Sequence, residues 1–290
     1  MRMRWYVSFA FLVPALLVYG ALVVFPALSG FWVSLTDFRG VGVANFVGLG
    51  NYRNIFEDSQ ALHAIRNSLI YTVLVVVIQN GLGLLFAVWL GSLPRIRNAV
   101  RVALFMPSMI AAIIVGFIWG YIYNPLNGPL NAALDALGLG FAKQIWLGDP
   151  NTALLAIVAV HVWMYLGHST AIFLAGYLCI AQELLDSAAI DGASPWNRFR
   201  FIEWPLMAAS TTIAVTLTTI GTLRIFDLPY VLTNGGPGDA TEMFGTVIYR
   251  NAFTGYRFGY ATALAVVMVL MILVISTIQN SFLRAREAQT

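Results

Sequence analysis

The residues of this chain whose types and spacing suit chemistry lie within two apolar stretches. His161, Tyr165 and His168 are spaced i, i+4 and i+7, which puts them on one helical face, and Thr218 and Thr222 are again four residues apart. Facing lipid would be costly for such groups, so we expect them to face a cavity or one another. They can hydrogen-bond a solute or join helices, and each threonine can instead donate to a carbonyl of its own helix.

An arginine and an aspartate follow the second stretch. Arg224 and Asp227 are spaced i, i+3 and can pair, which would lower the cost of both charges. Arg224 is expected near the far end of a span that begins at Pro205. We expect a structural pair there, with a gate or a solute contact as the alternative.

The motifs of common hydrolytic and phosphate-binding sites are missing. The three histidines show no HExxH spacing, and a GxSxG nucleophile elbow is absent. The only lysine, Lys143, stands in Ala-Lys-Gln, so no phosphate-binding Gly-Lys-Ser/Thr loop exists. The single cysteine, Cys179, excludes a disulfide framework and a thiolate metal cluster. We therefore expect neither an enzyme nor a metal or cofactor bound by this chain.

The composition indicates the protein class. Of 290 residues, 59% are hydrophobic and 10% charged, and the mean hydropathy is +0.79. A soluble domain carries about 25% charged residues. This excludes an ordinary globular enzyme, a nucleic-acid binder and a disordered scaffold, and the net charge of +3 is too small to indicate a polyanionic partner. The sequence predicts a polytopic α-helical membrane protein.

Six apolar runs are long enough to cross a bilayer. They cover residues 5–35, 68–90, 102–123, 152–180, 205–232 and 260–282. We therefore predict an all-α membrane protein with six transmembrane helices in a single domain, residues 1–290. The first run follows Arg2 and Arg4 as in a signal peptide, but it exceeds the usual apolar core of about 7–15 residues, so a retained anchor helix is expected.

Arginine placement indicates the orientation of the chain. The short loop between the second and third runs and the C-terminal tail are both arginine-rich, which favours a cytoplasmic location for both termini. On that side would lie Arg2, Arg4, Arg95, Arg97, Arg101, Arg198, Arg200, Arg284 and Arg286.

The one long polar segment on the same side covers residues 181–204 and reads AQELLDSAAIDGASPWNRFRFIEW. Its first half favours a short amphipathic helix, which Gly192 ends, and Ser194-Pro195 is typical of the start of a second helix. A helix–glycine–helix along the membrane surface suits docking into a groove of a partner protein. A plain connecting loop with interfacial helices is the alternative, and composition alone favours it.

This segment carries a family resemblance. DSA at 186–188, DGA at 191–193 and IEWP at 202–205 resemble the EAA loop of permease subunits in ATP-binding-cassette importers, whose pattern is E-A-A, two residues, D-G-A and later I-x-L-P. Asp186 stands where glutamate is usual, and Trp204 where leucine is usual. Residues 226–237, FDLPYVLTNGGP, are similar to an external loop of the carbohydrate branch of the family. The resemblance covers nearly the whole chain.

The resemblance implies a type I importer permease fold in which the cytoplasmic segment is a coupling helix for an ATPase subunit. Asp186 would face a basic residue of the ATPase, the alanines would permit close approach, and Gly192 would supply the turn. The implied coupling residues are Asp186, Ser187, Ala188, Ala189, Asp191, Gly192 and Ala193.

The resemblance also implies partners and a solute. The partners would be a second permease subunit, two ATPase subunits that bind ATP and Mg, an extracytoplasmic solute-binding protein and membrane lipid, with no nucleic acid. The solute would be a carbohydrate, either a sugar, an oligosaccharide or a glycerophosphate-type compound. The implied substrate residues are His161, Met164, Tyr165, His168, Thr218 and Thr222.

The expected function is therefore the import of a carbohydrate by alternating access across a bacterial or archaeal cytoplasmic membrane. One alternative is a secondary carrier driven by an ion gradient, with Asp227 or a histidine as its proton site. The lack of an inverted repeat and the scarcity of intramembrane carboxylates disfavour it. A second alternative is the same importer architecture serving a solute that is not a sugar.

Overall fold

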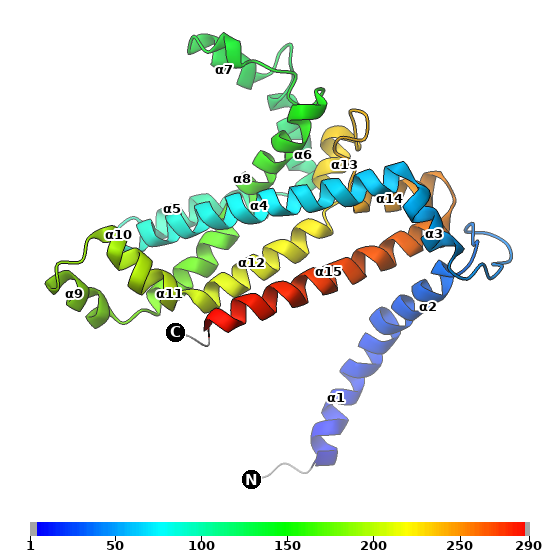
Figure 1. The fold of residues 1–290 in the computed structure, drawn as a ribbon, viewed down its shortest axis with the longest axis horizontal. Coiled ribbons are helices and arrows are strands. Elements are labelled where there is room, and N and C mark those ends of the chain that lie inside the picture. Colours follow the sequence, from blue (N-terminus) through cyan, green and yellow to red (C-terminus); the bar gives the residue numbers. More distant parts are fainter. Residues whose placement is uncertain (1–4, 288–290) are drawn as a thin grey trace. The chain divides into compact units, whose positions relative to one another are not determined.

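The computed structural model describes the backbone of residues 5–287 and the side chains of residues 12–285 and 287 (Figure 1). All regular secondary structure in this part is helical, and a β-bridge between Thr36 and Phe46 is isolated. Arg2 and Arg4, the basic residues before the first expected span, lie outside the described residues.

The helical elements follow one another closely along the chain. They are α1 (Trp5–Tyr19), η1 (Gly20–Val24), α2 (Phe25–Ser34), α3 (Gly50–Glu57), α4 (Ser59–Gly91), α5 (Arg97–Phe105), η2 (Met106–Met109), α6 (Ala112–Ile122), α7 (Pro129–Ala136), η3 (Gly140–Ala142), α8 (Pro150–Leu178), α9 (Gln182–Ile190), α10 (Pro195–Arg198), η4 (Phe199–Glu203), α11 (Trp204–Leu206), α12 (Ala208–Leu223), α13 (Asp227–Thr233), α14 (Phe244–Tyr249), η5 (Arg250–Thr254) and α15 (Phe258–Glu287).

Four of the described helices are long and apolar enough to cross a membrane by themselves, and the number of candidate spans is six if each of two bent helix pairs forms one span. The four are Leu12–Ser34, Ser59–Gly91, Pro150–Leu178 and Phe258–Ala285. The bent pairs are Arg97–Met109 with Ala112–Ile122, and Pro195–Leu206 with Ala208–Leu223. An all-helical chain with six spans agrees with the fold class that the sequence predicts.

The third run, expected as one helix over 102–123, is broken by 96° between Met109 and Ala112. Pro107 accounts for the break, because it lacks an N–H and cannot continue an α-helical ladder. The chain passes through the short 3₁₀ turn η2 and then through an extended residue, Ile110, before α6 begins.

Two other boundaries differ from the expected runs. The second span begins at Ser59 rather than near residue 68, because the Asp58 carboxylate accepts a hydrogen bond from the backbone N–H of Gln60 and caps the helix there. The fifth run, expected over 205–232, ends at Leu223, and residues 227–233 form the separate helix α13.

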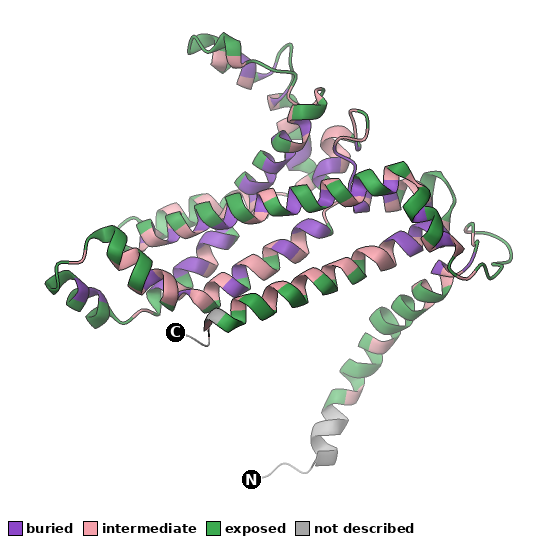
Figure 2. Ribbon diagram, in the orientation of Figure 1, coloured by how far each residue is buried: buried purple, intermediate pink, exposed green. Residues whose placement is uncertain are grey.

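One compact unit contains the residues up to Ala61 together with Val247–Val267. The apolar side chains of its N-terminal span stay exposed, as the green ribbon in Figure 2 shows. Asn51 ties the end of this span to α3 by donating from Nδ2 to the carbonyls of Ser34 and Thr36, both at 2.8 Å. In the following loop, Asn45 donates to both oxygens of Asp37, which lowers the pKa of that carboxyl.

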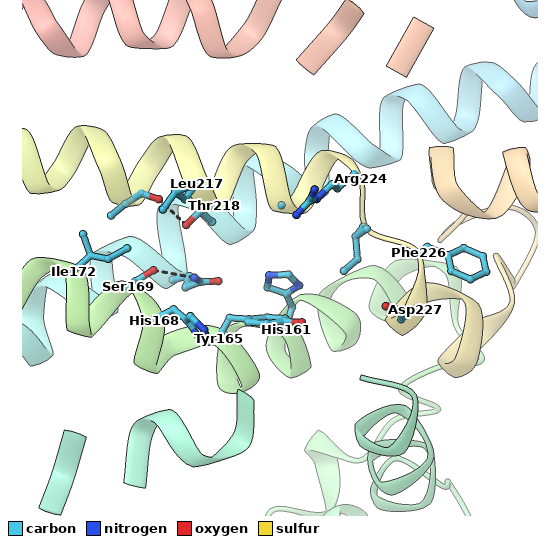
Figure 3. Close-up of a pocket in the computed structure, with 14 residues that line it drawn as sticks. His161, Tyr165, His168, Ser169, Ile172, Leu217, Thr218, Arg224, Phe226 and Asp227 are labelled. Carbon is cyan, nitrogen blue, oxygen red and sulfur yellow. Dashed lines mark hydrogen bonds between the residues drawn. The ribbon is translucent and has the colours of Figure 1, made fainter. Parts of the chain in front are cut away.

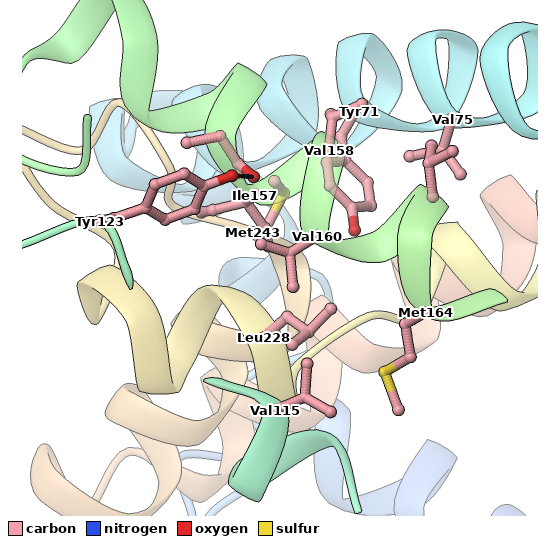
Figure 4. Close-up of a cluster of buried hydrophobic side chains, with 12 residues drawn as sticks. Tyr71, Val75, Val115, Tyr123, Ile157, Val158, Val160, Met164, Leu228 and Met243 are labelled. Carbon is pink, nitrogen blue, oxygen red and sulfur yellow. Dashed lines mark hydrogen bonds between the residues drawn. The ribbon is translucent and has the colours of Figure 1, made fainter. Parts of the chain in front are cut away.

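The other compact unit contains Leu62–Thr246 and the residues from Met268 onward. Its main apolar cluster joins α4, α6, α8 and α13 (Figure 4). A second cluster packs Phe173 and Tyr177 of α8 against Ala87 and Leu90 of α4. Helix α8 takes part in both clusters, so it is the central support on which the polar residues of this unit are displayed.

Close approach of helices in this unit depends on Gly167 of α8. A Cβ at this position would overlap the backbone carbonyl of Leu104, so α5 lies directly against α8. Small residues at helix contacts serve the same purpose in other membrane proteins, where packing is the main source of association.

Candidate functional site

The second unit contains a cavity of about 480 Å³ between α4, α8, α12 and the start of α13. Figure 3 shows side chains of α8 and α12 facing one another across it. The lining residues are Gln79, His161, Tyr165, His168, Ser169, Ile172, Ala214, Leu217, Thr218, Gly221, Arg224, Ile225, Phe226 and Asp227. The cavity combines aromatic faces with hydrogen-bonding groups, as sites for small polar ligands commonly do.

The three aromatic residues predicted on one face of α8 all line this cavity (Figure 3). The ring centroids of His161 and Tyr165 lie 4.7 Å apart, and those of Tyr165 and His168 lie 5.8 Å apart. The ring of Phe105, just before the break in the third span, lies 4.5 Å from that of His168, although Phe105 does not line the cavity. The rings therefore form a continuous aromatic wall.

His161 is buried, with 5% of its surface exposed, and its Nδ1 has no hydrogen-bond partner among the described residues. The Tyr71 ring meets it edge-on at 5.6 Å. A buried polar nitrogen without a partner is costly, so a ligand or a water molecule in the cavity would satisfy it.

Of the other three predicted substrate residues, two on α12 and one on α8, only one lines the cavity. Thr218 lines the cavity, although its hydroxyl also donates to the carbonyl of Ala214 at 2.8 Å. Thr222 is not among the lining residues, and its hydroxyl donates to the carbonyl of Thr218 at 2.9 Å. Met164 is likewise not among them, because it is buried in the apolar cluster of Figure 4.

Arg224 and Asp227 both line the cavity and are exposed to it. Among the described residues no ion pair joins Arg224 to Asp227, so the expected pairing is not observed. Arg224 ends α12 and Asp227 begins α13, and the change of direction between the helices separates the two side chains. Both charged groups are therefore placed to contact a solute.

Gln79 and Ser169 line the cavity, and neither is among the residues predicted from the sequence. Gln79 donates from Nε2 to Ser169 Oγ at 2.8 Å, which joins α4 to α8. The adjacent amides Gln79 and Asn80 in the middle of an apolar run are a signal that could have found this site, since buried amides in a membrane span require partners.

The predicted docking segment forms α9, a turn and α10. Gly192 follows α9 with φ +75°, and a Cβ there would meet nothing within 4 Å. The two alanines of α9 differ in burial: Ala188 is buried against the chain and Ala189 is exposed. Asp186 is exposed and accepts a hydrogen bond from Gln182 Nε2 at 2.9 Å.

The rest of this segment is arranged around the same turn. Ser187 is exposed and donates to the carbonyl of Glu183, and Asp191 is exposed beside Gly192. The N–H of Ala193 donates to the carbonyl of Ala188 and closes the end of α9. Ile190 is 86% exposed and is not among the residues predicted to contact a partner. Leu184 is also exposed, at 48%, so the outward surface combines carboxylates, small residues and two large apolar side chains.

A buried carboxylate, that of Glu203, bonds this segment to the end of α8. Glu203 is 1% exposed and accepts hydrogen bonds from Arg198 Nε at 2.8 Å and from the Tyr177 hydroxyl at 3.5 Å. These bonds link the residues after α10 to the end of α8.

Comparison with known proteins agrees with this architecture. The chain is 34% identical to a probable ABC transporter permease protein of Pyrococcus horikoshii, over 91% of each chain. It is also 34% identical to the trehalose/maltose transport system permease protein MalF of Thermococcus litoralis, over 93% of this chain and 90% of that protein.

A solved structure shares the fold. In the crystal structure of a bacterial alginate ABC transporter in complex with an alginate pentasaccharide-bound periplasmic protein, one chain matches with a TM-score of 0.84 and 21% identity, covering 97% of this chain and 95% of that one. This likeness confirms the predicted permease fold.

The family model for the inner membrane component of binding-protein-dependent transport systems matches residues 79–287. The match includes α8, α9 and α12, which carry most of the cavity and the whole of the predicted docking helix, α9. The chain therefore belongs to the family of inner membrane components of binding-protein-dependent transport systems.

Proposed function

We propose that this chain is a permease subunit that admits a carbohydrate to the cavity between α8 and α12 and releases it into the cytoplasm by alternating access. The observation that carries the proposal is the cavity itself, where an aromatic wall of His161, Tyr165 and His168 lies opposite hydrogen-bonding groups of α12. Aromatic faces and polar groups together suit the apolar and hydroxyl faces of a sugar ring. The trehalose/maltose permease among the relatives supports the same solute class.

The charges at the cavity favour an uncharged solute. Arg224 and Asp227 are the lining residues with full charges, and their charges are opposite. A carboxylate and a guanidinium that line one cavity can accept from and donate to hydroxyl groups without selecting for a net charge on the solute.

The proposed complex contains a second permease subunit, two ATPase subunits and an extracytoplasmic solute-binding protein. ATP and Mg would be bound by the ATPase subunits, and this chain would bind no cofactor. Helix α9 would enter an ATPase cleft with Asp186, Ala189 and Ile190 at the contact, because these residues face outward. Both termini would then lie in the cytoplasm, on the same side as α9.

The test of this function is ATP-dependent uptake by the complete complex in liposomes, with its solute-binding protein on the outside and ATP inside. The labelled solutes are maltose, trehalose, sucrose, cellobiose and a glycerophosphate, with spermidine as the representative of another class. Uptake of a sugar that stops without ATP or without the binding protein supports the proposal. Uptake of spermidine alone would assign the complex to another solute, and uptake driven by a proton gradient without ATP would indicate a secondary carrier.

The docking proposal has its own test. Gly192→Trp places a large ring where no atom of this chain lies within 4 Å, although any side chain strains the backbone at φ +75°. Gly192→Asn is the matched control, because asparagine tolerates a positive φ better than most residues. We expect the ATPase to co-purify with the asparagine variant and to be lost from the tryptophan variant. Retention of the ATPase by both variants would contradict docking at this turn.

A further inference from the structure

A chain of hydrogen bonds fixes the orientation of one amide in the cavity wall. It begins at Asn80, whose Nδ2 donates to the carbonyl of Val76 at 2.9 Å on its own helix. Asn80 Oδ1 is therefore the atom that faces the neighbouring helices, and it accepts a hydrogen bond from Ser169 Oγ at 3.2 Å. Thr218 Oγ1 of α12 lies 3.5 Å from the same oxygen. Asn80 thus acts as an acceptor where α4, α8 and α12 meet.

The next bond follows from the chemistry of a hydroxyl, which has a single proton. The Ser169 hydroxyl uses its single proton in the hydrogen bond that it donates to Asn80, so it can only accept a hydrogen bond from Gln79. The 2.8 Å bond between Gln79 and Ser169 must therefore use the amide NH₂ of Gln79 as donor. This relay of hydrogen bonds from Gln79 to Ser169 and from Ser169 to Asn80 fixes the orientation of the Gln79 amide. Its Oε1 is turned away from Ser169.

Gln79 Oε1 is a buried acceptor that no described residue satisfies. The side chain is 4% exposed and lines the cavity. His161 lines the same cavity, and its buried Nδ1 is also without a described partner. Two unpartnered polar atoms in one cavity wall indicate that its occupant completes their hydrogen bonds.

We propose that Gln79 is a specificity-determining residue whose Oε1 accepts a hydrogen bond from a hydroxyl group of the transported solute. The inference rests on the proposed function, because it assumes that the cavity holds a carbohydrate. A hydroxyl supplies the required proton, whereas a carboxylate, carbonyl or ether oxygen would face the amide oxygen with a second acceptor. The relay through Ser169 and Asn80 prevents the amide from rotating to accommodate such a group.

The experiment uses the complete complex in liposomes and the disaccharide that it imports fastest among maltose, trehalose, sucrose and cellobiose. The competitors are the monodeoxyfluoro derivatives of that disaccharide, in which fluorine replaces one hydroxyl and cannot donate. We expect the wild-type complex to bind one derivative about tenfold more weakly than the parent sugar, the size of one lost hydrogen bond. Gln79→Met should raise KM for the parent sugar by a similar factor. This variant should then bind that derivative and the parent sugar equally well.

Two further variants make the result specific. Ser169→Ala keeps the volume of Gln79 but removes the acceptor of its NH₂, so the amide can rotate and the fluorinated derivative should be accepted. Thr72→Val is the matched control: Thr72 is on the same helix, buried, and has an unpartnered hydroxyl, but does not line the cavity. It should leave KM and discrimination unchanged.

The outcomes separate this inference from the proposed function. Wild-type discrimination that persists in either Gln79→Met or Ser169→Ala would overturn the role of Gln79 while leaving carbohydrate import intact. A rise in KM in Thr72→Val as large as that in Gln79→Met would also overturn the role of Gln79. A general effect of the substitutions on the structure would then explain the change in both variants. Uptake of spermidine by the wild-type complex, with no uptake of any sugar, would contradict the proposed function, and the inference with it.

Discussion

The guanidinium of Arg198 donates from Nε to Oε1 of Glu203 at 2.8 Å, in a pair whose carboxylate side chain is 1% exposed and whose arginine is 33% exposed. The pair connects α10, which follows α9, the helix proposed to dock into the ATPase, to the segment that leads into α12. The Tyr177 hydroxyl reaches the same carboxylate oxygen from α8. Movement imposed on α9 by a partner would therefore reach α8 and α12 through this cluster.

The Arg198–Glu203 pair gives a first prediction. Arg198→Met leaves a buried carboxylate without its charge partner, and we expect a loss of about 2 kcal/mol in unfolding free energy, below the usual range for a fully buried pair because Arg198 is partly exposed. The double variant Arg198→Met with Glu203→Leu should recover most of that loss, because no unpaired charge remains. Chemical unfolding of the purified permease measures both, and a double variant as unstable as the single one would argue against the pair.

Ala188 and Ala189 give a second prediction, because one faces the chain and the other faces outward. Ala189→Leu should leave the unfolding midpoint unchanged and reduce the amount of ATPase that co-purifies. Ala188→Leu should overpack the chain itself and cost about 1–3 kcal/mol of stability. Co-purification and thermal unfolding, measured on both variants, distinguish the two roles. Equal ATPase recovery from Ala189→Leu and wild type would place the partner contact elsewhere.

Arg224 and Asp227 give a third prediction. Because they line the same cavity without an ion pair between them, Arg224→Gln and Asp227→Asn should each raise KM for the solute, and their effects should be nearly additive in a double-mutant cycle. Each lost charged hydrogen bond is expected to raise KM roughly tenfold. A double variant no worse than either single variant would indicate that the two residues act as a pair.

Gly167 gives a fourth prediction about the support of the cavity. Gly167→Ala places a methyl group against the backbone of Leu104, which must move because a carbonyl cannot rotate away. We expect a loss of about 1–3 kcal/mol and weaker solute binding, since Phe105 and His168 would separate. Gly81→Ala, in a helix with nothing within 4 Å of the new Cβ, is the control and should be neutral or slightly stabilising.

The sequence predicted the helical class and the location of most of the cavity well, because both depend on patterns local to one helix. The i, i+4, i+7 spacing of His161, Tyr165 and His168 needs only one regular helix to bring the three side chains together, and α8 is unbroken from Pro150 to Leu178. The break near Pro107 was missed because the run of apolar residues continues through it.

Contacts between helices could not be predicted from spacing. The pairing of Gln79 with Ser169 joins residues 90 positions apart, and nothing in either local pattern specifies the other partner. The spacing of Arg224 and Asp227 predicted a pair only on the assumption of a continuous helix, and α12 ends at Leu223. The burial of Met164 follows from its position on a different face of α8, toward the apolar cluster.

The most direct test of the central claim is a cryo-electron microscopy structure of the complete complex, trapped with its imported sugar. The account predicts density for the sugar between α8 and α12, in contact with the ring of Tyr165 and within hydrogen-bond distance of His161 and Gln79. Sugar density only in the second permease subunit, with the cavity of this chain filled by its own side chains, would contradict it.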